Sequence, residues 1–163
     1  MSQVRSLSGP PVFFFSEFKV LHLINDLTDK FFGFLSEDPV RPNIPYVDRI
    51  GDHKDIFVMR DAEDKAQAIT CVSYQATVPS SESELFAYTD SPEVAVFYTI
   101  WSYKPGAGRQ LIFDAVAYIK ENRQDIKRFV TLSPKTEMAR RFHIKNGAIV
   151  LRENHDTVNY EYL

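Results

Sequence analysis

The sequence has 163 residues, a length typical of a single folded domain. Hydrophobic residues make up 44% of it and charged residues 25%, which excludes a disordered or collagen-like protein, and Phe alone accounts for 13 residues. The net charge of −3 argues against a nonspecific nucleic-acid binder, and the single cysteine, Cys71, excludes a disulfide framework.

The first half of the chain is predicted to hold one helix between strands. An apolar run at residues 12–15 predicts a short strand, and Ser16 is a candidate N-cap for a helix over Glu17–Leu35, whose apolar residues recur at helical spacing. A loop with three prolines follows over residues 37–45. Residues 55–60 and 66–77 flank a polar turn, and this pattern predicts a β-hairpin.

The second half alternates strands and helices. Glu93–Trp101 is rich in β-branched and aromatic residues and predicts a central strand, which a glycine turn and a helix follow. A short strand is predicted at 128–132. Ser133 and Pro134 have the types preferred at a helix start, and Gly147 is typical of a helix end. Strands at 148–153 and 157–162 complete an α/β protein of the α+β type with a mixed, mostly antiparallel sheet.

The clearest chemical signal is the segment Tyr103–Arg109, where the central strand ends in Gly106-Ala107-Gly108 and a helix begins. Backbone N–H groups and the helix dipole favour an anion at such a turn, and glycines let a ligand approach the backbone closely. Lys104 and Arg109 add positive charge. The segment is neither a P-loop nor a Rossmann fingerprint, because it lacks Gly-Lys-Ser/Thr and a third glycine. It predicts a phosphate-binding site.

This turn resembles the acyl-CoA motif of the GNAT N-acetyltransferase superfamily, in which a strand, the pattern (Arg/Gln)-x-x-Gly-x-(Gly/Ala) and a helix follow one another. A later helix of the family carries the pattern Asn-x-x-Ala-x-x-Phe/Leu-Tyr-x-x-x-Gly. Ala139, Phe142 and Gly147 fall in register with that pattern here. The similarity covers about residues 93–163.

Three positions depart from the family pattern, since Tyr103 replaces Arg or Gln, Thr136 replaces Asn and His143 replaces Tyr. The resemblance implies one domain over residues 1–163, with an acceptor-side half at 1–92 and a CoA-binding half at 93–163. It implies a GNAT-like twisted sheet with helices on both faces. It also implies an N-acetyltransferase that uses acetyl-CoA as co-substrate and a small molecule or a protein as amine acceptor.

Acyl transfer in this family needs groups that bind CoA and groups that move protons. By register the resemblance implies that His143 protonates the departing thiolate, a role that suits a side chain titrating near neutrality. Glu93 is the candidate base for the amine, with Glu84 and Asp90 as alternatives. The implied CoA-binding residues are Tyr98, Thr99, Ile100, Tyr103, Lys104, Gly106, Ala107, Gly108, Arg109, Ser133 and Thr136.

Two other functions stay open. His143 with Ser133 or Thr136 is similar to the histidine and hydroxyl pair of GNAT-fold decarboxylases that act on malonyl-type thioesters. A non-catalytic CoA-binding or interaction module would account for the departures from the family pattern. Release of CO2 without an amine would favour the decarboxylase, and binding without turnover would favour the module.

Charge and aromatic residues give further expectations about partners. Residues 1–90 carry 8 Lys and Arg against 14 Asp and Glu, and residues 91–163 carry 11 against 8, so a cationic ligand suits the first part and an anionic one the second. No apolar run could span a membrane, no secretion signal is evident and no histidine has metal-ligand spacing, so a cytoplasmic protein without metal is expected. Phe31, Phe32 and Phe34 cannot share one helix side, and they predict an acceptor with an apolar portion or a homodimer contact.

Overall fold

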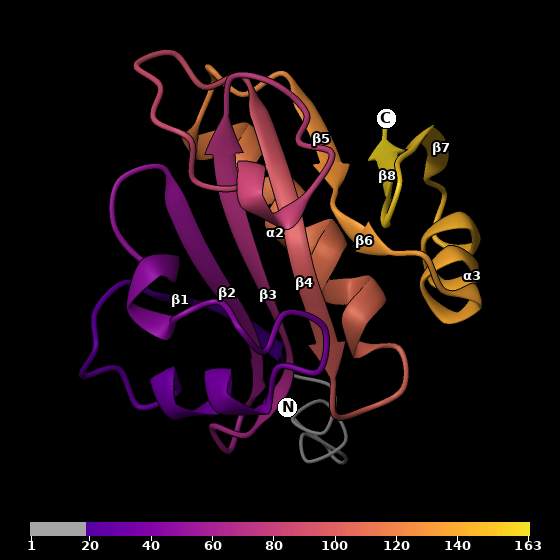
Figure 1. Cartoon of the computed structure of the whole chain (residues 1–163). Coiled ribbons are helices and arrows are strands. Elements are labelled where there is room, and N and C mark those ends of the chain that lie inside the picture. Colours follow the sequence, from indigo (N-terminus) through magenta and orange to yellow (C-terminus); the bar gives the residue numbers. More distant parts are fainter. Residues whose placement is uncertain (1–18) are drawn as a thin grey trace.

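The computed structural model describes residues 19–163, so the strand predicted at 12–15 and the Ser16 cap lie outside the described residues. One eight-stranded sheet holds the strands in the order β1-β2-β3-β4-β5-β8-β6, with β7 paired to β8 (Figure 1). Only β4 and β5 pair in parallel. The strands are β1 (Lys19–Ile24), β2 (Lys54–Asp61), β3 (Ala66–Gln75), β4 (Val94–Ser102), β5 (Arg128–Thr131), β6 (Ser133–Pro134), β7 (Ile149–Glu153) and β8 (Thr157–Tyr162).

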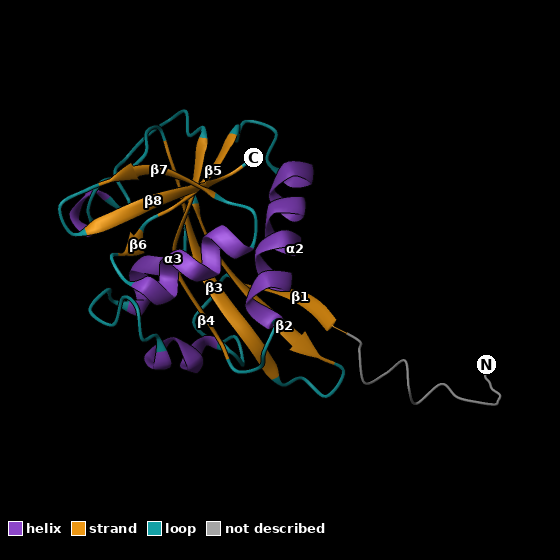
Figure 2. Cartoon of the chain, turned by 90° about the vertical axis from the view of Figure 1, so that its right-hand side faces the viewer, coloured by secondary structure: helices purple, strands orange, loops and turns teal. Residues whose placement is uncertain are grey.

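Helices cover both faces of this sheet, as predicted. The helix α2 (Ala107–Asn122) packs on one face, and α3 (Glu137–Lys145) lies beside it (Figure 2). The other face carries the 3-10 helices η1 (Phe32–Glu37), η2 (Tyr46–Arg49) and η3 (Glu82–Glu84) with their loops. Each face has its own apolar layer, which we call the α2 layer and the loop layer. None of the helices in residues 19–163 has the length and apolar character that crossing a membrane takes.

Most predicted elements are confirmed, but the first helix is wrong. The chain forms β1 over Lys19–Ile24, which pairs with β2, and within residues 19–37 only η1 is helical. The side chains of Asp26 and Asp29 accept hydrogen bonds from the backbone N–H groups of Thr28 and Phe31. Such local bonds compete with helical ones. The apolar residues before them gain a β-ladder instead, because β2 offers an edge.

The predicted start of the last helix is also wrong. Ser133 and Pro134 form β6 against β8. The N-cap is Thr136, whose Oγ1 accepts a hydrogen bond from the N–H of Ala139 at 3.2 Å. The helix therefore begins three residues later than expected, because a hydroxyl at 136 meets an otherwise unsatisfied N–H group. It ends where predicted, at Gly147 with φ of 98°.

Candidate functional site

The sheet opens between β4 and β5. These strands pair only over Val94–Phe97, and the N–H of Leu132 still donates to the carbonyl of Phe97 at 3.0 Å. The chain then turns away as β6. A bulge opposite Cys71 and Val72 adds Tyr98 as an extra residue of β4. Among the described residues, the edge of β4 from Tyr98 to Ser102 therefore has no partner strand on this side.

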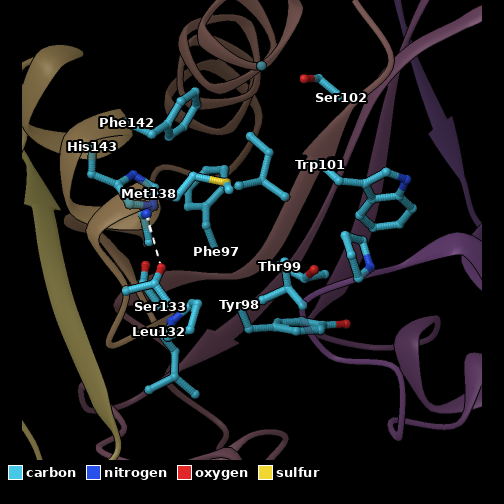
Figure 3. Close-up of a pocket in the computed structure, with 17 residues that line it drawn as sticks. Phe97, Tyr98, Thr99, Trp101, Ser102, Leu132, Ser133, Met138, Phe142 and His143 are labelled. Atoms are coloured by element: carbon cyan, nitrogen blue, oxygen red, sulfur yellow. Dashed lines mark hydrogen bonds between the residues drawn. The ribbon is translucent and has the colours of Figure 1, made fainter.

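A pocket of about 380 Å³ fills the opening, a volume in the range of small-molecule sites. Figure 3 shows Met138, Phe142 and His143 on one side of it and Tyr98 and Trp101 on the other. Phe142 packs on the α2 layer, whereas Tyr98 and Trp101 belong to the loop layer. The pocket thus lies where the strands part, and residues of both layers line it.

Many of the predicted site residues meet at this pocket. Those that line it are Tyr98, Thr99, Ile100, Gly108, Ser133, Thr136 and His143. Tyr103, Lys104, Gly106, Ala107 and Arg109 form the neighbouring turn and the first residues of α2. The segment of β4, the start of α2 and the start of α3 are therefore brought together as the sequence predicted.

Glu93 lies apart from this group. It immediately precedes β4 and is exposed. Its backbone N–H donates to the carbonyl of Gln75 at 2.9 Å, and its carbonyl accepts a hydrogen bond from the N–H of Lys127 at 2.7 Å. The part of β4 that lines the pocket begins at Phe97, about 13 Å further along an extended strand. The alternative Glu84 accepts hydrogen bonds from Ser80. The structure does not bring either carboxylate to His143.

The glycine turn has the predicted backbone, but its second glycine serves packing. Gly106 is the N-cap of α2 with φ of 81°, a conformation that favours glycine. A Cβ atom at Gly108 would lie 3.3 Å from the Phe142 ring, so this glycine lets α2 approach α3. The guanidinium of Arg109 lies over the Phe113 ring, 4.9 Å from its centroid. Gly108 lines the pocket, so the first turn of α2 borders it.

Tyr103 links β4 to the loop layer. Its hydroxyl donates to the carboxylate of Glu37 and accepts a hydrogen bond from Nε1 of Trp101 at 3.0 Å. Burial and then the bond to Glu37 raise the pKa of Tyr103 to about 12. At the position where the GNAT pattern has Arg or Gln, this chain therefore has a neutral side chain bound to the loop.

His143 is 3% exposed and tightly held. Its ring stacks on Tyr160 with centroids 5.0 Å apart, and Nδ1 lies 2.7 Å from the hydroxyl of Tyr162. Burial lowers the pKa of His143 to about 4, so the imidazole is neutral at pH 7. The expectation that it titrates near neutrality is wrong. When Tyr162 donates to Nδ1, the proton of the neutral ring lies on Nε2.

Because His143 is buried and neutral, the free energy of unfolding should depend on pH. Its folded pKa of about 4 lies below the unfolded value of about 6.5, so the unfolded chain binds more protons between these pH values. The stabilisation is present above pH 6.5 and is lost as the pH falls towards 4, by about 3 kcal/mol. We expect the free energy of unfolding, measured with urea, to fall in this way in the natural protein. In a His143→Phe variant, which has no titrating group at this position, the part of the fall that His143 causes should be absent. Identical pH dependence in both proteins would contradict the assignment.

A buried ion pair holds the loop against β4. Oδ2 of Asp38 accepts a hydrogen bond from Nη1 of Arg49 at 2.7 Å, and both side chains are fully buried. Oδ1 of Asp38 accepts one from Oγ1 of Thr99 at 2.7 Å. A second arginine, Arg41, donates to the carbonyls of Tyr98 at 3.1 Å and Leu132 at 2.7 Å. It thereby bridges the two chain segments where they part.

Sequence reasoning missed Asp38, Arg41, Arg49 and Tyr162. Asp38 and Thr99 are 61 residues apart, and Arg41 and Leu132 are 91 residues apart, so no local spacing links them. Tyr162 occupies an ordinary position of a β-strand. The three prolines of residues 37–45 marked a loop, but nothing in their spacing indicated that it forms a pocket wall. Its residues Pro39 and Val40 line the pocket.

The fold can now be compared with those of known proteins. No family model matches the sequence, and no curated protein matches it either. Among solved structures, malonyl-CoA decarboxylase from Rhodopseudomonas palustris is similar with a TM-score of 0.69 and 18% identity, over 93% of this chain and 61% of that one. This chain therefore spans less than two thirds of the decarboxylase chain.

Two acetyltransferase structures match over most of both chains. An acetyltransferase from Bacillus subtilis in complex with CoA has a TM-score of 0.61 and 13% identity, over 89% of this chain and 99% of that one. The GNAT domain of PAT from S. lividans has a TM-score of 0.60 and 12% identity, over 87% and 88%. These likenesses confirm at the level of fold the resemblance predicted from residues 93–163. The chain therefore has the fold of the GNAT acetyltransferases, which part of the malonyl-CoA decarboxylases also shares.

Proposed function

We propose that the protein is an acyl-CoA-dependent N-acyltransferase. In this proposal it transfers an acyl group, namely the acetyl group of acetyl-CoA, to a primary amine. The observation that carries this proposal is the pocket at the free edge of β4, which is lined by residues from both faces of the sheet. Such a pocket suits a reaction between two substrates, because the thioester and the amine can contact different walls of it. The similar acetyltransferase structure in complex with CoA supports the same reading.

The residues around the pocket suit the parts of an acyl-CoA. The edge of β4 beyond Tyr98, whose carbonyl already accepts a hydrogen bond from Arg41, offers backbone groups to an extended amide chain. The first turn of α2 offers N–H groups and the positive end of the helix dipole to phosphates. Arg109 is exposed there and adds a full positive charge, as does Lys104.

The chemistry follows from the neutral state of His143. The amine nitrogen forms a bond to the thioester carbonyl carbon, and the carbon–sulfur bond breaks. The sulfur takes the proton of Nε2, and the proton released by the amine replaces it there through water. The Tyr162 hydroxyl, 2.7 Å from Nδ1, stays hydrogen-bonded to that nitrogen and holds the ring in place. The proton of the attacking amine passes to water, since neither Glu93 nor Glu84 lies at the pocket.

Binding of acetyl-CoA tests the first step. At a concentration of a hundred times its Kd, the ligand adds about 2.7 kcal/mol to the free energy of unfolding. We therefore expect the Tm to rise by about 5–10 °C. Arg109→Gln should weaken binding because it removes a charge next to the turn. Lys120→Gln, on an exposed position near the other end of α2, is the matched control and should bind normally. No shift at millimolar acetyl-CoA would contradict the proposal.

Decarboxylation of a malonyl-type thioester is a second candidate. Ser133 and His143 line the same pocket, and the decarboxylase structure has a TM-score of 0.69. Release of CO2 from malonyl-CoA in the absence of an amine would identify this activity. The acyltransferase instead releases CoA only when an amine is present. Binding of acyl-CoA without either reaction would indicate the non-catalytic module.

A further inference from the structure

On the loop side, an exposed carboxylate lies close to residues that line the pocket. Glu37 ends η1 and is exposed, and the chain continues from it to Pro39 and Val40, which line the pocket. Trp101 lines the pocket as well and donates to the Tyr103 hydroxyl, which in turn donates to Glu37. The carboxylate is thus attached to the pocket wall from two directions.

The aromatic ring of Tyr103, which is bonded to this carboxylate, contacts two further aromatic side chains. The rings of Phe34 and Tyr103 are in edge contact with centroids 5.9 Å apart, and the indole of Trp101 is bonded to Tyr103 at 3.0 Å. Tyr103 is 44% exposed, whereas Trp101 is 8% exposed. A carboxylate beside the rings of Trp and Tyr is the combination that recognises an organic cation, through charge and through the ring quadrupoles.

The charge of Glu37 is not neutralised by the protein. Among residues 19–163, no basic side chain lies within ion-pair distance of it. The nearby carboxylates differ, because Asp38 pairs with Arg49 and Glu82 pairs with Arg41. A carboxylate has about four lone-pair sites, and the hydrogen bond from Tyr103 occupies one of the sites on Glu37. The remaining sites can accept N–H donors from a ligand.

We propose that Glu37, Trp101 and Tyr103 bind a positively charged ammonium group of the acceptor, distinct from the amine that reacts. This inference rests on the proposed acyl transfer. The reacting amine must be neutral when it attacks, so a group held as a cation by Glu37 is a second one. The acceptor class is therefore an aliphatic molecule with two amino groups, such as a diaminoalkane, and its chain lies along the apolar pocket wall at Val40 and Trp101.

Trp101 is the only tryptophan, so its fluorescence reports on this site directly. The probe is tetramethylammonium, which cannot be acylated, with tert-butanol as an uncharged probe of similar shape. We expect tetramethylammonium to change the emission and tert-butanol to leave it unchanged. Glu37→Gln should weaken binding of the cation at least about tenfold, because the amide keeps the shape of the side chain and loses its charge. Glu121→Gln, on an exposed position of α2, is the matched control and should respond like the natural protein.

A second measurement compares two amines as acceptors. We expect 1,5-diaminopentane to have a KM at least about tenfold below that of 1-aminopentane, and the difference to vanish in Glu37→Gln. An equal response of Glu37→Gln and the natural protein to tetramethylammonium would overturn the cation site. So would the absence of any response in a protein that acetyl-CoA still stabilises. If the cation binds and acetyl-CoA does not, the acyltransferase proposal fails and the cation site stands.

Discussion

His143→Ala is expected to lower kcat for acyl transfer at least about a hundredfold, with little change in the Kd of acetyl-CoA. The imidazole lines the pocket, and in the proposed mechanism it supplies the proton for the departing thiolate. The backbone edge of β4 and the first turn of α2 are the proposed binding site of the thioester substrate. Single-turnover kinetics separate the chemical step from binding, and thermal shift with acetyl-CoA confirms that the variant still binds. Full turnover by His143→Ala would remove this residue from the mechanism.

Tyr162→Phe is the companion variant. It keeps the ring and loses the hydroxyl, which lies 2.7 Å from Nδ1 of His143, so we expect a smaller loss of kcat than in His143→Ala. Tyr162 acts through His143 and is a positioning residue. Because burial lowers the pKa of His143 to about 4, kcat of the natural protein should show no inflection near pH 6.5 from this group. A clear inflection there that His143→Ala abolishes would show that the imidazole is charged at neutral pH.

Arg49→Met is expected to reduce the free energy of unfolding by about 3–5 kcal/mol. The guanidinium is fully buried with Asp38 and also donates to the backbone carbonyls of Arg41 and Ile44. Without it a carboxylate and two carbonyls lose their partner inside the loop layer. Urea unfolding at pH 7 measures the loss. A change below about 1 kcal/mol would show that the pair adds nothing to this wall of the pocket.

The matched control is Arg128→Met. Arg128 also binds a carboxylate with two hydrogen bonds, both 2.8 Å long to Glu161, but its side chain is 43% exposed. Water can take the place of the exposed Arg128 guanidinium, although Glu161 is only 11% exposed, so we expect a loss smaller than that of Arg49→Met. The double variant Asp38→Asn with Arg49→Met should be more stable than Arg49→Met alone, because it removes the unpaired charge.

Much of the fold could be predicted because its signals are local. The hairpin of β2 and β3, the central strand β4 and the helix α2 follow from alternation, β-branched residues and the glycine turn. Strand β1 could not be predicted, because the spacing of Val20 and Ile24 suits a helix as well as a strand. The turns at Asp26 and Asp29 and the edge of β2 decide between the two. The same holds for Ser133, whose place in β6 depends on its partner strand β8.

Residue type and spacing predicted the class of the fold, the glycine turn at the start of α2 and the position of His143 in the last helix, because these features are local. Tertiary structure alone decided the protonation state of His143, which burial beneath Tyr160 and Tyr162 sets. It also decided the loop wall of the pocket and the contact of Glu37 with Tyr103. Segments far apart in the chain meet there, and side-chain bonds across such separations leave no pattern in the order of residues.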